Sequence, residues 1–266
     1  MSTSESLSQL NIEDDLRRIE RALGVARDAL ADYTSGRIAS TLKAGGDTVT
    51  EADLAVDAAI KAVLLKPGEG WLSEETADDL IRLSCRRVWI VDPIDGTREF
   101  IKGIPEWCVS IALAIDGKAV AGGVLNPATG ESVVGGVGSP PKYVGHREPV
   151  SASGFADATI LASRSEVKRG EWEAFTALGL NVVPMGSVAF KLALVAAGRA
   201  DATWTLVPKR EWDVAGGAAL LNAAGAHYRR KDHADMAFNR EHTLLPGFVA
   251  SRGSIAAEVE SALLAS

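Results

Sequence analysis

Two carboxylates three positions apart follow an apolar run in the segment Val91-Asp92-Pro93-Ile94-Asp95-Gly96-Thr97. Arg87–Val91 is β-rich, and we expect the strand to stop at Asp92-Pro93 because proline cannot donate to a strand ladder. Two carboxylates beside an exposed backbone carbonyl form a hard oxygen site suited to Mg²⁺. If the N–H groups of Gly96 and Thr97 open a helical turn, they would face an anion such as phosphate. A plain strand-to-turn junction is the alternative, since Asp, Pro and Gly are common there.

Further acids occur in three other segments. Ser73-Glu74-Glu75-Thr76 follows an apolar pair and, taken alone, is typical of a solvated turn or helix start. Glu211-Trp212-Asp213 opens an Ala- and Gly-rich helix, where Asp213 alone is most simply a cap or a partner of the helix dipole. Asp53 stands three residues after Thr50, which resembles a capping box with Asp in place of Glu.

Taken together and in this order, four motifs resemble the inositol monophosphatase superfamily. They are VTEAD (Val49–Asp53), SEE (Ser73–Glu75), DPIDGT (Asp92–Thr97) and WDVAGG (Trp212–Gly217). The combination is specific, whereas a lone DxxD would be weak. The resemblance implies an α/β fold, a layered αβαβα sandwich, and Mg²⁺-dependent hydrolysis of a small phosphate monoester by an activated water.

The resemblance also implies roles, carried over by position. A first Mg²⁺ would be held by Glu74, Asp92 and the Ile94 carbonyl, and a second by Asp92, Asp95 and Asp213; a third, weaker ion could share Glu74. Catalytic roles are implied for Thr97, Asp53 and Glu74, with Thr97 and Asp53 orienting the water, and Gly96 and Thr97 are the implied phosphate contacts. Five carboxylates balance two or three dications better than they tolerate one another.

Within the superfamily the chain is most similar to the CysQ-type branch, the 3′(2′),5′-bisphosphate nucleotidases. Asp95-Gly-Thr-Arg-Glu-Phe-Ile101 is similar to that branch's DGT-[KR]-EF, and Ala162-Ser-Arg-Ser165 to its SRS segment. The implied substrate contacts are Gly186, Ser187, Lys191 and Glu211. Candidate partners of a second phosphate are Lys191, Lys209, Arg210 and Arg164. The chain departs from the branch at Val207-Pro208-Lys209, where Gly-Pro-Thr is usual.

Two other functions stay open. One is an inositol or other polyol monophosphatase, or a histidinol phosphate phosphatase; against it, inositol monophosphatases carry a sugar-contacting Glu about where Thr205 and Leu206 stand here. Neither residue can replace a carboxylate as an acceptor for ring hydroxyls. The other is a catalytically silent family member that binds a phosphorylated metabolite. Retention of all five acids and Thr97 argues against it.

The elements that must position these residues follow from hydrophobic periodicity. Helices are predicted over Asn11–Tyr33 and Thr50–Leu65, and strands over Arg87–Val91, Trp107–Ile115 and Ala119–Val124. Gly135–Pro149 is interpreted as a connection. Strands and helices then alternate over Thr159–Ser163, Lys168–Leu178, Val182–Met185, Ser187–Ala197, Ala200–Thr205 and Trp212–Ala224. This rhythm indicates an α+β first half (1–148) with most metal ligands and an α/β second half (149–266) with the substrate loop and the last ligand.

Composition excludes several classes of protein. The 266 residues carry 28 Lys and Arg against 35 Asp and Glu, a net charge of −7, which argues against binding nucleic-acid polymers or anionic membranes. The two cysteines form no CxxC pair, so no zinc ribbon is expected. The longest stretch without charge, Ala174–Phe190, is too short and broken to span a membrane. We expect a cytoplasmic protein, and the resemblance implies a homodimer and sensitivity to Li⁺.

Overall fold

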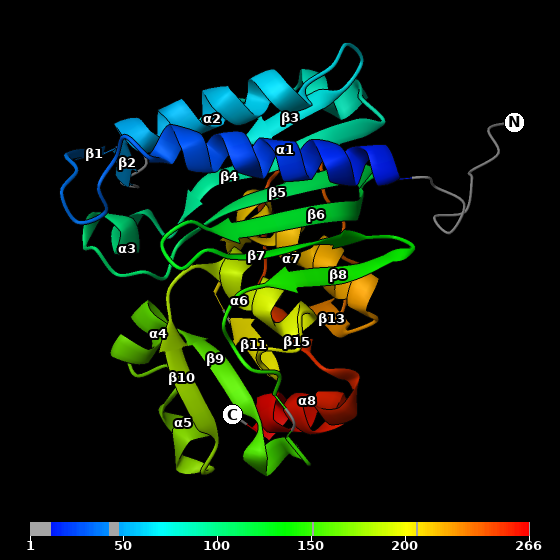
Figure 1. The fold of residues 1–266 in the computed structure, drawn as a ribbon. Coiled ribbons are helices and arrows are strands. Elements are labelled where there is room, and N and C mark those ends of the chain that lie inside the picture. The colour runs from blue at the N-terminus through cyan, green and yellow to red at the C-terminus, as the bar shows by residue number, and fades with distance from the viewer. Residues whose placement is uncertain (1–11, 43–47, 151, 206, 266) are drawn as a thin grey trace, which may run out of the picture.

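The computed structural model describes residues 12–42, 48–150, 152–205 and 207–265. Five layers are stacked in the order helices, sheet, helices, sheet, helices (Figure 1). This αβαβα arrangement confirms the predicted fold class. In the described parts of the chain, no helix combines the length and the apolar character needed to cross a membrane.

The first layer is a pair of helices, α1 (Glu13–Leu30) and α2 (Glu51–Leu64), joined through a small hairpin of β1 (Ser40–Leu42) and β2 (Thr48–Thr50). Apolar residues recur along α1 at three- and four-residue steps and are buried there. Asn11, where the first helix was predicted to start, lies outside the described residues. The capping box predicted at the start of α2 is confirmed, since Asp53 Oδ2 accepts from both the N–H (2.7 Å) and the hydroxyl (2.6 Å) of Thr50.

The second layer is a six-stranded sheet in the order β3-β4-β5-β6-β7-β8. Its strands are β3 (Gly70–Ser73), β4 (Arg87–Asp95), β5 (Cys108–Ile115), β6 (Lys118–Asn126), β7 (Glu131–Gly136) and β8 (Ser139–Val144). Both faces are covered: Trp89 and Val91 pack with the first helices, whereas Val88 and Ile90 pack with the central ones. The short helix α3 (Thr97–Ile101) follows β4 directly.

The central layer consists of α6 (Val188–Ala196) and α7 (Glu211–Ala224). Glycine lets α7 approach the first sheet closely. A Cβ on Gly216 would stand 2.5 Å from Ser110 Oγ on β5, and a Cβ on Gly122 of β6 would stand 2.5 Å from the Gly216 carbonyl oxygen. The Gly-rich part of the WDVAGG motif therefore seats α7 against the sheet, with its N-terminal turn and Asp213 near the end of β4.

The second sheet has the order β10-β9-β11-β15-β13. Its strands are β9 (Thr159–Ser163), β10 (Asn181–Met185), β11 (Ala202–Thr205), β13 (His227–Arg230) and β15 (Phe248–Ser251), and β12 (Lys209–Arg210) pairs separately with β14 (Leu244–Leu245). The outer face carries α4 (Arg164–Lys168), α5 (Glu173–Ala177) and α8 (Ala256–Ala265), with a core that includes Phe175, Trp204 and Val259.

Three sequence predictions were wrong in detail. The stretch 135–149 is no plain connection, because β7 ends and β8 forms within it, and alternate residues of β8 face solvent. The strand before the DPIDGT motif runs on through Pro93 to Asp95, where its register with β5 shifts. The helix predicted over Lys168–Leu178 begins at the last residue of α4, continues in a turn at the left-handed Gly170, and is helical again in α5.

Candidate active site

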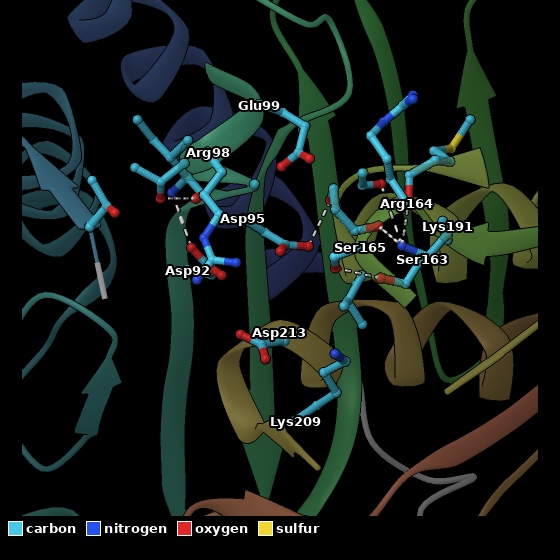
Figure 2. Close-up of a pocket in the computed structure, with 18 of the residues that line it drawn as sticks. Asp92, Asp95, Arg98, Glu99, Ser163, Arg164, Ser165, Lys191, Lys209 and Asp213 are labelled. Atoms are coloured by element: carbon cyan, nitrogen blue, oxygen red, sulfur yellow. Dashed lines mark hydrogen bonds between the residues drawn. The ribbon is translucent and has the colours of Figure 1, made fainter. Parts of the chain in front are cut away.

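Three carboxylates meet at one end of the first sheet. Oxygen atoms of Asp92, Asp95 and Asp213 all lie within 4.8 Å of one another. Asp92 and Asp95 come from β4 and Asp213 from the first turn of α7 (Figure 2). Glu74, the fourth predicted metal ligand, lines the same cavity, together with Ile94.

Strand register explains this convergence. In the parallel pair β3 and β4, Ser73 stands opposite Val91, and Glu74 N donates to the Val91 carbonyl (3.3 Å). Glu74 therefore leaves its strand beside Asp92. The irregularity between Asp92 and Asp95 in the pairing of β4 with β5 allows both acids to reach one site, since a bulge re-aims the side chains next to it.

Asp95 is held in place by two hydrogen bonds from the start of α6. Its Oδ2 accepts hydrogen bonds from Ser187 Oγ (2.7 Å) and from Ala189 N (2.5 Å), both at the start of α6. These donors come from the second half of the chain, so this predicted metal ligand also ties the two halves together. Ser187 is itself held in the left-handed region (φ 57°), which a non-glycine residue keeps only when its surroundings demand it.

The cluster is electrostatically unfavourable without cations. Burial, followed by the charges of Glu74, Asp95 and Asp213, holds the pKa of Asp92 well above its ordinary value. The pKa of Asp213 is raised well above its ordinary value by burial and then by the charges of Asp95 and Glu74. An all-oxygen donor set with excess negative charge fits a hard divalent cation such as Mg²⁺.

Thr97 and Asp53 lie together beside this cluster. Thr97 Oγ1 is within hydrogen-bond distance of Asp53 Oδ1 (3.3 Å) and of the Ile94 carbonyl (3.0 Å). Asp53 is buried at the N-terminus of α2 and does not line the cavity, whereas Thr97 and Gly96 do. Asp53 can therefore orient the Thr97 hydroxyl but reaches the cavity only through it.

The cavity has a volume of about 470 Å³ and is lined by both negatively and positively charged side chains. Among the described residues its lining contains five carboxylates and six cationic side chains. The carboxylates are Glu74, Asp92, Asp95, Glu99 and Asp213, and the cations are Arg98, Lys102, Arg164, Lys168, Lys191 and Lys209. Figure 2 shows Arg164 and Lys191 beside Ser163 and Ser165, across the cavity from Asp92. This volume lies within the range of small-ligand sites.

The predicted substrate loop, with Gly186, Ser187 and Lys191, lines the cavity. Its polar side chains, however, already form hydrogen bonds within the protein. The Lys191 ammonium donates to the carbonyls of Met185 (3.3 Å), Gly186 (3.4 Å) and Ser187 (2.6 Å). Burial lowers the pKa of Lys191 to about 8. The loop is thus held from inside by Lys191, while the Ser187 hydroxyl is used by Asp95.

Two predicted substrate contacts lie outside the cavity lining. Glu211 is wholly buried and accepts from the backbone N–H groups of Asn239 (2.6 Å) and Arg240 (3.0 Å); burial raises its pKa to about 7. Arg210 is exposed, and its Nη1 donates to Thr243 Oγ1 (3.3 Å). In this geometry Glu211 fastens the segment 239–240 to α7 and offers no free oxygen to a ligand.

Other lining residues were missed by sequence reasoning. Arg98, Glu99 and Lys102 belong to α3 or its end, directly after the DPIDGT motif, and Lys168 closes α4. Their signal is weak, because a surface Lys or Arg is common without any role. The one hint that the sequence offered is position: Arg98 and Glu99 belong to the motif DGTREF, and Lys102 and Lys168 closely follow DGTREF and SRS.

Known proteins resemble this chain over most of its length. The model of the inositol monophosphatase family matches residues 14–265. An inositol-1-monophosphatase of Mesorhizobium japonicum is 35% identical over 218 residues (78% of this chain, 81% of the relative). A 3′-phosphoadenosine 5′-phosphate phosphatase of Mycobacterium leprae is 35% identical over 205 residues (72% of each chain). The crystal structure of CysQ from Bacteroides thetaiotaomicron superposes with a TM-score of 0.75 at 27% identity, covering 91% of this chain and 99% of that one.

Proposed function

The chain belongs to the inositol monophosphatase family and is a phosphoric monoester hydrolase, and we propose that its substrate is a 3′(2′),5′-bisphosphate nucleotide. 3′-Phosphoadenosine 5′-phosphate, which would be split to AMP and phosphate, is the preferred example. The proposed cofactor is Mg²⁺, as two or three ions. A cytoplasmic location and a homodimer remain predictions.

The observation that carries the proposal is the charge of the cavity lining. With two dications bound, the six cationic side chains and five carboxylates of the lining leave about +5, and Glu106 and Glu166, which pair with Arg164 and Lys209, reduce this to about +3. A phosphate monoester carries roughly −1.5 to −2 at pH 7, so one phosphate leaves an excess of positive charge. A substrate with two phosphate groups matches the lining better. Arg164 lies across the cavity from Asp92, where a second phosphate would find a partner, and Lys168 also lines the cavity.

The proposed metal ligands are Glu74, Asp92, the Ile94 carbonyl, Asp95 and Asp213. When bound, Mg²⁺ would supply positive charge to the phosphate oxygens and acidify the attacking water. Asp95 would keep its position because Ser187 and Ala189 bind the oxygen that faces α6.

Thr97 would orient the attacking water. The single proton of the Thr97 hydroxyl has two acceptors within reach, Asp53 Oδ1 (3.3 Å) and the Ile94 carbonyl (3.0 Å). With Mg²⁺ on the Ile94 carbonyl, Asp53 Oδ1 would take this proton as acceptor, which would leave the hydroxyl oxygen free to accept a hydrogen bond from water. Asp53 itself is fixed by Thr50, whose N–H and hydroxyl bind its other oxygen. The chain Thr50–Asp53–Thr97 thus sets the direction in which a water can approach phosphorus, and positioning of this kind carries phosphoryl transfer.

An inositol or related polyol phosphate is the second candidate, favoured by the relative from Mesorhizobium japonicum. The sugar-contacting carboxylate of inositol monophosphatases has no counterpart at Thr205, which is buried and donates its hydroxyl to Glu166 (2.5 Å). Leu206 lies outside the described residues. The equal identities of the two relatives, 35% each, do not separate the candidates, so the cavity charge decides our preference.

The test is a comparison of kcat/KM for 3′-phosphoadenosine 5′-phosphate, inositol 1-phosphate and histidinol phosphate, each with Mg²⁺ and with a chelator. We expect phosphate release only with Mg²⁺ and the highest kcat/KM for the nucleotide. A higher value for inositol 1-phosphate would replace our proposal by the second candidate. Absence of Mg²⁺-dependent release from every compound would favour a silent, metabolite-binding family member.

A further inference from the structure

One carboxylate at the rim of the cavity joins three segments that are distant in the sequence. Glu106 lies between α3 and β5, Arg164 is the first residue of α4, and Gly186 lies between β10 and α6. The Glu106 carboxylate accepts from Arg164 Nη2 with both oxygens (2.5 Å each), from Arg164 Nε (3.1 Å) and from Gly186 N (2.8 Å). No role in the proposed reaction has been assigned to Glu106 so far.

The Glu106 interaction fixes the orientation of Arg164. The two-point contact with a carboxylate holds a guanidinium in one plane, because both groups are planar and their spacing matches. The contact uses Nε and Nη2, and Nη1 forms no hydrogen bond with any residue that the structure describes. The Arg164 side chain is 42% exposed and lines the cavity, so Nη1 is accessible to a ligand.

The same carboxylate supports the loop that begins α6. Gly186 is packed so closely that a Cβ there would stand 2.6 Å from the Glu106 backbone oxygen. The next residue, Ser187, reaches Asp95. Glu106 is therefore connected to the proposed second-phosphate site by Arg164, and to the proposed metal ligand Asp95 by the loop of Gly186 and Ser187.

We propose that Glu106 is a positioning residue that presents Arg164 to the second phosphate of a bisphosphate substrate, so that the Glu106–Arg164 pair determines selectivity for bisphosphates over monophosphates. This inference rests on the proposed function. Holding Arg164 in place before the ligand arrives removes part of the entropic cost of binding it. The negative charge of Glu106 opposes a phosphate, and the lining cations Lys102 and Lys168 offset it.

The proposal is tested with Glu106→Gln and Arg164→Lys. Glutamine keeps the size and an oxygen for Gly186 N but loses the charged two-point contact, and lysine keeps the positive charge but loses the planar fork. Glu171→Gln is a matched control, because Glu171 pairs with Arg169 (2.5 Å) on the surface outside the cavity lining. Circular dichroism and thermal unfolding check that each variant is folded.

The measurement is equilibrium binding of 3′-phosphoadenosine 5′-phosphate and of adenosine 3′-phosphate by calorimetry, with Ca²⁺ in place of Mg²⁺ so that nothing is turned over. We expect wild type to prefer the bisphosphate, and Glu106→Gln and Arg164→Lys each to weaken bisphosphate binding about tenfold, as loss of a charged hydrogen bond does. Binding of the monophosphate should stay within about twofold of wild type, and the control should change neither. The double variant should lose no more than the worse single variant, because Glu106 acts through Arg164.

Three results would overturn the proposal: wild type without a preference for the bisphosphate, equal losses for both nucleotides, or losses that add in the double variant. Equal losses would indicate that Glu106 only supports the loop. Because binding is read without turnover, the test also holds if the bisphosphate is not the substrate. A wild-type enzyme that binds the bisphosphate selectively but hydrolyses only other esters would contradict the proposed function and leave the role of Glu106 standing.

Discussion

Replacing Thr97 by alanine tests the proposed water-orienting group with little change elsewhere. The substitution removes the hydroxyl that contacts Asp53 Oδ1 (3.3 Å) and the Ile94 carbonyl (3.0 Å). Asp53 keeps both hydrogen bonds from Thr50, so its charge is still satisfied at Oδ2. Loss of one long hydrogen bond from a half-buried hydroxyl costs about 1 kcal/mol of unfolding free energy.

The expected loss in rate is much larger than this loss in stability would explain. Positioned groups that assist proton transfer contribute typically about 10²- to 10⁴-fold, and Thr97 only orients the water, so we expect kcat to fall about 100-fold. Thr97 is not a proposed metal ligand, so the Mg²⁺ concentration for half-maximal rate should change by less than about threefold, under 1 kcal/mol.

The assay is steady-state phosphate release over a Mg²⁺ titration, with urea unfolding of the same samples. Thr97→Ser is the matched control, because serine keeps the hydroxyl and should retain kcat within a few-fold. Retention of most of the wild-type kcat by Thr97→Ala would refute the water-orienting role. A serine variant as impaired as the alanine variant would show that the methyl group, and not the hydroxyl, matters.

Three further predictions concern metal binding, stability and the loop. Asp95→Asn should fold, because an amide oxygen can still accept from Ser187 and Ala189, but its phosphate release should fall at least about 100-fold; a wild-type rate would exclude Asp95 as a ligand. Burial opposes ionisation of Glu69, but hydrogen bonds from Arg18 and Trp89 outweigh it and lower its pKa to about 2. Its stabilising contribution is therefore present above its ordinary pKa of 4.5 and lost as pH falls toward 2. Glu69→Gln should cost about 2 kcal/mol in urea unfolding at pH 7, a difference that shrinks toward pH 2; an equal cost at both pH values would contradict the ionic role. Gly186→Ala should reduce kcat/KM at least about tenfold, because its Cβ would clash with the Glu106 backbone oxygen; unchanged kinetics would mean that the loop can shift without consequence.

Features of this fold that depend on neighbouring residues were predictable from the sequence, whereas features that depend on strand pairing were not. The strand that ends in the DPIDGT motif, the capping box of α2 and the helix after Glu211 were predictable, because each depends on residues that are neighbours in the chain. β7 and β8 were not predictable, since Gly135, Pro140 and Pro141 are typical of a turn. The alternation of half-buried and exposed residues along β8 becomes evident only when β8 pairs with β7. The extension of β4 through Pro93 likewise depends on pairing with β5.

For the site itself, the amino-acid sequence determined which carboxylates are available. Asp92 and Asp95 stand in one motif, Asp213 lies at the start of a predicted helix, and Glu74 follows an apolar pair in the SEE motif. Only the tertiary structure decided what surrounds them. In the folded chain Glu211 is buried against 239–240, and the Lys191 ammonium donates to loop carbonyls. Glu106 contacts Arg164 and Gly186, which lie 58 and 80 positions away in the sequence. A motif reports the chemical type of a side chain, whereas its partners are set by strand register and by how closely the layers pack, and these depend on the whole chain at once.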